Sequence, residues 1–321
     1  MEQAILNFNK QFLFEPIVVN ADKLKKYKHY ILGGMGGSHL AAGILKSHSP
    51  GIELYVHRDY GIPQFDEEFM KDSLFIANSY SGNTEEIVDF AEEAYDRGFD
   101  VAVIATGGIL IDFAKENNLP YIVIPNDGIQ PRSALGYSLV ALAALVGEND
   151  CLQDAKKLSD ALNPESLKKA GEDLATVLKG KVPVIYSSLS NLSVSYNWKI
   201  KFNETSKVPA FYNVFPELNH NEINGFDLAE DIKYLADNFH FIFISDSEDN
   251  PQIIKRMEVT ESIYQTKGMP VTRIYLEGNG KLERIFRSLL VADWAAVAIA
   301  RANGVDPESV PVVEDLKSRL K

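Results

Sequence analysis

The chain has 321 residues, of which 45% are hydrophobic and 24% charged, a balance typical of globular proteins with room for two domains of ordinary size. Its net charge of −13 and the lack of a lysine- or arginine-rich block argue against nucleic acid as a partner, because a phosphate backbone demands a basic surface. The longest apolar stretch, residues 133–147, is shorter than the roughly 20 residues that span a bilayer, so we expect no membrane partner.

The N-terminus and the cysteine content bear on the cellular compartment. Met1, Glu2 and Gln3 form no basic region ahead of an apolar run, so we expect no signal peptide. Cys151 is the only cysteine, which precludes an internal disulfide and fits a reducing compartment. We therefore expect a cytoplasmic protein.

Short apolar segments alternate with helical patterns in the first half of the chain. The expected strands are residues 30–32, 52–56, 73–77, 101–104 and 121–124. Helical stretches lie between most of them, for example at residues 84–97. This alternation predicts an α/β domain, residues 1–150, whose mainly parallel sheet is flanked by helices on both faces.

A polar helical segment at residues 154–179 has little strand character, and we interpret residues 151–180 as a helical connection. The strand–helix pattern then restarts in a second domain, residues 181–321. Its expected strands are residues 182–186, 240–244 and 271–275. Its expected helices are residues 252–266, 282–301 and 307–320, the last of them C-terminal.

The two halves look like a diverged repeat, because residues 75–84 parallel residues 241–250. The second copy carries three acidic residues, Asp246, Glu248 and Asp249, where the first copy is neutral. These carboxylates would repel a phosphate dianion. If one half binds phosphate, we expect it to be the first.

The first candidate phosphate-binding turn is the glycine-rich segment 33–38, between an expected strand and a helix. Glycines let the backbone approach an oxyanion, and a helix N-terminus offers free N–H groups. A dinucleotide fingerprint would need Gly or Ala where His39 stands, so that match fails, although Asp59 lies near the position of a ribose-binding acid. A tight turn without a ligand is the alternative.

The second candidate is the segment 79–86, which also joins a strand to a helix. Its three hydroxyls and several backbone N–H groups are suited to converge on one phosphate. The alternative is an ordinary helix cap, because Asn83 followed by Glu86 resembles a capping box. Both turns are expected at the carboxyl ends of strands in one sheet, the usual ligand crevice of open α/β folds.

Together, residues 34–38 and 79–84 resemble the paired phosphosugar loops of the sugar isomerase (SIS) domain. The resemblance implies a three-layer αβα architecture around a five-stranded parallel sheet, and hence two SIS-type domains in this chain. It also implies that glycines and hydroxyls bind the phosphate of the substrate. These residues are Gly36, Gly37, Ser38, Ser79, Ser81 and Thr84.

Three further side chains are suited to catalysis. Arg132 precedes the longest apolar helix, where a cation opposes the helix dipole but where a guanidinium can stabilise an oxyanion. Glu204 is a candidate general base. His220, which lies among two asparagines and two glutamates, can shuttle a proton near neutral pH. Taken singly, each is as readily a solvated surface side chain.

In combination, the segments 131–137, 203–204 and 217–222 closely resemble motifs of the bifunctional phosphoglucose/phosphomannose isomerases, a family of two tandem SIS domains of about this length. The resemblance implies that Glu204 moves a proton between C1 and C2 of the sugar. It further implies that His220 helps to open the sugar ring and that Arg132 stabilises the enediolate.

The same resemblance implies a homodimer in which His220 reaches the site of the neighbouring subunit. Lys317 resembles the C-terminal active-site lysine of the family. His39 departs from the family pattern, in which small residues are commoner after the glycine-rich serine. Its ring either alters the packing of the phosphate loop or adds a polar contact to it.

The expected function is therefore aldose–ketose isomerisation between glucose 6-phosphate and/or mannose 6-phosphate and fructose 6-phosphate, with sugar 6-phosphates as the partners. We expect no cofactor and no metal, because the chain has no HExxH motif and no clustered Cys/His ligands. The alternatives are a non-catalytic SIS module that senses a sugar phosphate, an amino-sugar phosphate isomerase, and, more distantly, a nucleotide-dependent oxidoreductase.

Overall fold

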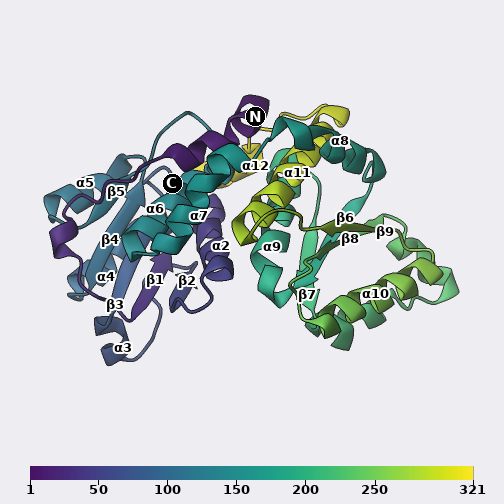
Figure 1. Ribbon diagram of the computed structural model, residues 1–321, viewed down its shortest axis with the longest axis horizontal. Helices are drawn as coiled ribbons and strands as arrows, with labels where there is room; N and C mark the ends of the chain where they lie inside the picture. Colours follow the sequence, from purple (N-terminus) through teal and green to yellow (C-terminus); the bar gives the residue numbers. More distant parts are fainter. Residues whose placement is uncertain (321) are drawn as a thin grey trace. The chain divides into compact units, whose positions relative to one another are not determined.

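The computed structural model describes residues 1–320 as two compact units, each built around its own sheet (Figure 1). The first unit comprises Asn7–Ala161. The second comprises Met1–Leu6 and the described residues from Leu162 onward. The boundary between the two units therefore lies between Ala161 and Leu162, within residues 151–180, which we interpreted as a helical connection.

The sheet of the first unit has five parallel strands in the order β2-β1-β3-β4-β5. Their bounds are β1 His29–Gly33, β2 Leu54–His57, β3 Ser73–Asn78, β4 Asp100–Ala105 and β5 Tyr121–Val123. All five lie where the apolar segments predicted them. The sheet grows in opposite directions from β1 and β3, and such a topological switch point opens a crevice at the carboxyl ends of the two strands.

Helices cover both faces of this sheet. The helices of the first unit are α2 Leu40–His48, α3 Glu67–Lys71, α4 Glu85–Asp96, α5 Gly108–Glu116, α6 Leu135–Val146 and α7 Asn149–Ala161. On one face, Phe75 of β3 and Val103 of β4 pack against Phe90 of α4 and Leu110 of α5. The other face is covered by α2 and α6, which also pack on each other.

The sheet of the second unit has four parallel strands in the order β7-β6-β8-β9. Their bounds are β6 Val182–Ser188, β7 Phe211–Phe215, β8 Phe239–Ser245 and β9 Val271–Tyr275. The order repeats that of β2-β1-β3-β4, which is the topology expected of a diverged repeat. No fifth strand follows within residues 1–320, so this sheet is shorter than the SIS resemblance implied.

Strand β7 was not among the predicted elements. It lies at the edge of the sheet, and four of its five residues are exposed or only half-buried. Asn213 interrupts its apolar character. An edge strand needs no continuous apolar run, because only one side of it is paired and little of it is buried.

The second unit also has a three-layer arrangement. Its helices are α1 Glu2–Leu6, α8 Lys168–Val177, α9 Leu192–Lys201, α10 Pro251–Thr266, α11 Lys281–Ala302 and α12 Pro311–Leu320. Helix α10 lies on one side of the sheet, and α9 and α11 lie on the other (Figure 1). A buried ion pair, with 2.7 Å between Lys201 Nζ and Asp293 Oδ1, joins α9 to α11. No helix in residues 1–320 is both long enough and apolar enough to cross a membrane.

Candidate active site

The two predicted phosphate loops meet at the switch point of the first sheet, directly after β1 and β3. The side-chain amide of Asn78 donates to the Ser38 carbonyl over 2.7 Å. The Tyr80 N–H donates to Ser38 Oγ over 3.0 Å. These buried bonds fix the glycine-rich loop against the serine-rich loop.

The hydroxyls of the second loop converge on one turn. Ser79 Oγ lies 2.8 Å from Thr84 Oγ1 and accepts the Gly82 N–H over 3.2 Å. Ser81, which is exposed, accepts the Asn83 N–H on its Oγ over 3.2 Å. The loop therefore presents a concentration of neutral donors at the crevice, as an oxyanion site requires.

The shape of this turn depends on Gly82. Its φ is +70°, and a Cβ atom there would lie 1.8 Å from the Gly107 carbonyl oxygen, so no other residue fits. The adjacent Asn83 accepts the Ile109 N–H over 3.0 Å and so joins the turn to α5. Helix α4 begins after Thr84 without a side-chain cap. The capping-box interpretation of Asn83 and Glu86 is therefore wrong.

Arg132 lies at the same edge of the sheet, in the 3₁₀ turn Pro131–Ser133 that precedes α6. The turn packs on the glycine-rich loop so closely that a Cβ on Gly37 would lie 2.8 Å from the Arg132 backbone nitrogen. Arg132 is only 3% exposed, which excludes a solvated surface arginine. A guanidinium held in a buried position can stabilise an oxyanion.

Gln11 fixes the Arg132 turn and was not predicted. Its Nε2 donates to the Ser133 carbonyl over 2.7 Å, while its Oε1 accepts the Gly136 N–H over 2.9 Å and the Tyr137 N–H over 3.3 Å. The buried amide thus caps α6 in place of a local residue. No local signal could identify it, because it lies more than 120 residues earlier in the chain.

His39, at which the resemblance implied a departure from the family pattern, ends the Gly36–His39 turn and is buried. Burial, with a smaller effect from Arg58, lowers the pKa of His39 to about 4. The ring is therefore neutral at pH 7 and adds no positive charge to the loop. A hydrogen bond between the ring and the backbone of Gly36 is the polar contact that His39 adds to the loop.

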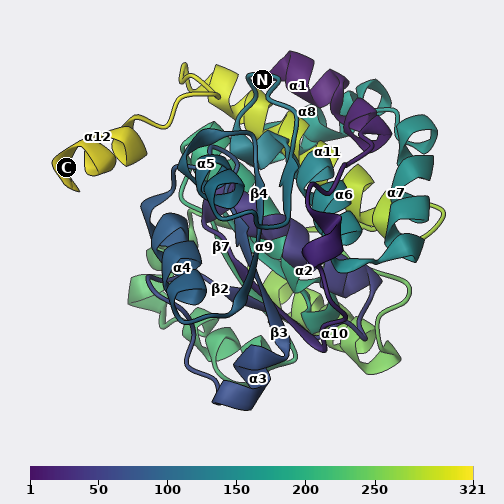
Figure 2. The ribbon, with the colours of Figure 1, turned by 90° about the vertical axis from the view of Figure 1, so that its left-hand side faces the viewer.

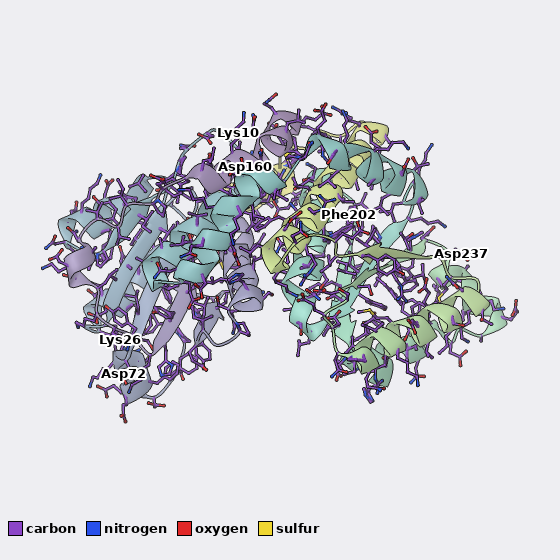
Figure 3. All side chains as sticks on the ribbon, in the orientation of Figure 1. Lys10, Lys26, Asp72, Asp160, Phe202 and Asp237 are labelled. Atoms are coloured by element: carbon purple, nitrogen blue, oxygen red, sulfur yellow. The ribbon has the colours of Figure 1, made fainter. Side chains whose placement is uncertain are left out.

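Glu204 lies in the second unit, in the π-helical turn Phe202–Ser206 that continues α9. Phe202, which is labelled in Figure 3, packs against Trp198 with 6.1 Å between ring centroids. Ser206 Oγ donates to the Ala296 carbonyl over 3.1 Å, and Lys207, with φ of +54°, ends the turn. Single π-helical turns occur frequently at functional sites. The contacts of Phe202 and Ser206 hold this turn in place, and the turn carries the half-buried carboxylate of Glu204.

His220 ends the 3₁₀ turn Glu217–His220, which follows β7. Leu218 of this turn is fully buried in the core of the second unit, whereas His220 is exposed. Within residues 1–320 no hydrogen bond or ion pair involves the His220 ring, so the imidazole is available to an external group.

Lys317 lies on α12, which follows α11 through an extended connection (Figure 2). Its side chain is exposed and its Nζ lies 3.6 Å from Glu314 of the same helix. The structure thus brings the two phosphate loops and Arg132 together at one edge of the first sheet. It places Glu204, His220 and Lys317 on three separate elements of the second unit.

Known proteins resemble the chain over nearly its whole length. Residues 167–320 match the family model described as the bacterial phospho-glucose isomerase C-terminal SIS domain. The bifunctional phosphoglucose/phosphomannose isomerase of Aquifex aeolicus is 34% identical, in an alignment that covers 99% of this chain and 98% of that protein. The chain belongs to the bifunctional phosphoglucose/phosphomannose isomerase family.

A second member of the family, from Thermoplasma acidophilum, is 35% identical over 92% of this chain and 90% of its own length. Among solved structures, the glucosamine-6-phosphate deaminase of Thermotoga maritima superposes with a TM-score of 0.69 over 97% of each chain, at 15% identity. That likeness concerns the fold alone. With the family model, it identifies both units as SIS-type αβα domains, as predicted.

In this family member, the corresponding crevice of the second sheet is filled by the chain's own carboxylates. Ser188 Oγ donates to Asp249 over 2.5 Å, and the Asn191 amide donates to the same carboxylate over 3.2 Å. Lys281 Nζ lies 2.9 Å from Asp246. Burial raises the pKa of Asp249. The donors that would face a phosphate there already have acidic partners.

Proposed function

We propose that the protein interconverts glucose 6-phosphate and/or mannose 6-phosphate with fructose 6-phosphate through an enediol(ate). The observation that carries this proposal is the likeness to bifunctional phosphoglucose/phosphomannose isomerases over 99% of the chain. The segments that hold Arg132, Glu204 and His220 are all present. A sugar-phosphate sensor would need the phosphate loops but not these three residues together.

The phosphate of the substrate binds, in this proposal, between the loops after β1 and β3. Gly36 and Gly37 leave room for close approach of the backbone, and the hydroxyls of Ser38, Ser79, Ser81 and Thr84 supply neutral donors. Neutral donors suit a ligand that has to be released in every turnover. The second sheet is disfavoured as a site because its crevice contains the buried carboxylates of Asp246 and Asp249.

Beyond phosphate binding, the reaction requires ring opening, proton transfer between two carbons, and stabilisation of the enediolate. His220 moves the proton that opens the sugar ring, a role that an imidazole can fill near neutral pH. Glu204 transfers a proton between C2 and C1, a contribution of about 10²–10⁴-fold. Arg132 stabilises the negative oxygen of the enediolate, and Lys317 takes the place of the C-terminal active-site lysine.

Substituting the base tests this assignment. We expect Glu204→Gln to lower kcat by at least about 10²-fold, because an amide cannot accept the C2 proton, while the affinity for fructose 6-phosphate changes little. The measurement is a coupled assay of fructose 6-phosphate formation from each aldose, with a chelator present, alongside calorimetric binding. Glu230→Gln, an exposed acid of the same unit paired with Lys233, is the matched control.

Three outcomes of these measurements, with glucosamine 6-phosphate as an additional substrate, would contradict the proposal. Near-normal turnover by Glu204→Gln would remove the base assignment. Tight binding of fructose 6-phosphate by a wild-type protein that isomerises neither aldose would indicate a sensor, and turnover of glucosamine 6-phosphate instead would indicate an amino-sugar isomerase.

We further propose that the protein is a cytoplasmic homodimer in which His220 of one subunit serves the site of the other. The exposed ring of His220, on a loop whose neighbouring residues are held in place, supports a role toward a partner. The single, fully buried Cys151 supports a reducing compartment.

A further inference from the structure

The residues that flank His220 are anchored to the second unit, while His220 itself is exposed. We propose that Glu222 is the positioning residue for His220: its carboxylate clamps the chain two residues beyond the imidazole and so fixes where the ring lies. This inference rests on the proposed function, since it assigns His220 to ring opening.

The clamp joins the loop to two strands at once. Glu222 Oε1 accepts a hydrogen bond from the Tyr186 hydroxyl on β6, and its Oε2 accepts one from the Asn213 side-chain amide on β7. Tyr186 and Asn213 are directly opposite each other in the parallel pairing of these strands. One carboxylate therefore ties the loop to adjacent positions on one face of the sheet.

The Tyr186 hydroxyl is a rigid anchor. Its ring is fully buried among Phe215, Phe243 and Tyr264, with centroids 6.0, 5.5 and 6.5 Å away. Burial, the neighbouring Tyr264 and the bond to Glu222 raise the pKa of Tyr186 well above its usual range, so the hydroxyl keeps its proton and donates. A buried donor of this kind is costly to leave without an acceptor.

The chain before His220 is held as firmly. Leu218 is buried in the core that contains Tyr186. The Asn219 amide donates to Thr260 Oγ1 on α10 over 2.9 Å. On the other side, Asn221 accepts the Glu222 N–H over 2.6 Å. Ile223 packs against the same core, and the Asn221 amide donates to Glu217 over 2.7 Å. Loss of the Glu222 clamp would therefore loosen only the short segment between His220 and Ile223.

The partners of Glu222 distinguish positioning from an electrostatic role. Both are neutral donors, so within the described residues the carboxylate serves to hold a shape and not to balance a cation. A glutamine can keep both contacts, because its amide oxygen can accept from Asn213 while its NH₂ donates to the Tyr186 oxygen, whose own proton then turns to the neighbouring Tyr264 hydroxyl. An alanine can keep neither.

The test is a double-mutant cycle with His220. We expect Glu222→Ala to lower kcat by about 10- to 100-fold with little change in KM, because a small misplacement of a catalytic group costs that much. Glu222→Gln should stay within about 3-fold of wild type. In a His220→Asn background, Glu222→Ala should change kcat by less than about 2-fold, since there is no imidazole left to position.

Tyr186→Phe gives a second route if Glu222→Ala folds poorly, because it removes one of the two bonds without opening a cavity, and it should lower kcat in the same direction by a smaller factor. Glu230→Ala is the control and should behave as wild type. Equal losses from Glu222→Ala in both backgrounds, or equal losses from the Gln and Ala variants, would overturn the inference. Wild-type isomerase activity in the same assay separates that failure from a failure of the proposed function.

Discussion

At the scale of single residues, His39 shows how a departure from the family pattern is accommodated. The residue is 7% exposed and directly follows Ser38 in the chain. Because the pKa of His39 is lowered from 6.5 to about 4, the folded protein keeps the ring neutral at pH values between these two, where the unfolded chain would protonate it. The loop therefore keeps its neutral character at physiological pH although it carries a titratable residue.

This burial predicts a pH-dependent stability. The pKa of His39 is about 4 in the folded protein and 6.5 in the unfolded chain, so the unfolded state binds more protons between these values. The contribution of the buried, neutral His39 to the free energy of unfolding is fully present above pH 6.5 and is lost as the pH falls toward 4. Between pH 7 and pH 5 the loss from this residue is roughly 2 kcal/mol.

Urea unfolding of wild type and His39→Gln at the two pH values measures that contribution. Between pH 7 and pH 5, the free energy of unfolding of the variant should fall by roughly 2 kcal/mol less than that of wild type. His240, whose pKa burial also lowers, remains in both proteins and cancels in the comparison. The same loss in wild type and variant would show that the His39 ring is solvated.

At the scale of elements, the inner strands β1, β3 and β4 could be predicted because they are largely buried and read as continuous apolar runs. The edge strands β2 and β5 are only partly buried, but they carry apolar, β-prone residues without a polar interruption in their middle. The edge strand β7 could not be predicted, since Asn213 and its half-exposed neighbours break that pattern. Both predicted phosphate loops were proposed from glycines and hydroxyls at strand ends. The alternation of strands and helices predicted that the loops share one edge of the sheet, but not that β1 and β3 are neighbours.

Other features of the site depend on contacts between distant parts of the chain. The burial of Arg132 could not be inferred from its position at a helix start, because the turn that carries it packs on Gly37, a residue from a distant part of the chain. Gln11 caps α6 from the opposite end of the first unit's sequence. The Glu222 clamp joins residues of two neighbouring strands and a loop. Sequence spacing carries no information about such partners.

At the scale of the whole molecule, the two sheets share a strand order but differ in what occupies their switch points. The first presents glycines and hydroxyls, and the second presents Asp246 and Asp249 paired with its own donors. In the proposed function, only the first repeat therefore binds the phosphate of the substrate. This difference between the repeats predicts one sugar phosphate per chain.

The shared His220 of the proposed dimer predicts complementation between two inactive variants. In a mixed dimer of Glu204→Gln and His220→Asn, one site receives an intact Glu204 from one chain and an intact His220 from the other. An equal mixture after subunit exchange should regain about a quarter of wild-type activity, because half of the dimers are mixed and each has one intact site.

The exchange itself is verified by copurification of the two variants with different affinity tags. Mixed dimers that form but stay as inactive as either parent would mean that both residues act within one chain.

The most direct test of the account is a crystal structure of the protein with fructose 6-phosphate. We predict the phosphate between the Gly36–His39 turn and the loop of residues 79–84, with the Arg132 guanidinium directed toward the first two carbons of the sugar. A phosphate bound instead at the carboxyl ends of β6 and β8, or a sugar remote from Arg132, would contradict it.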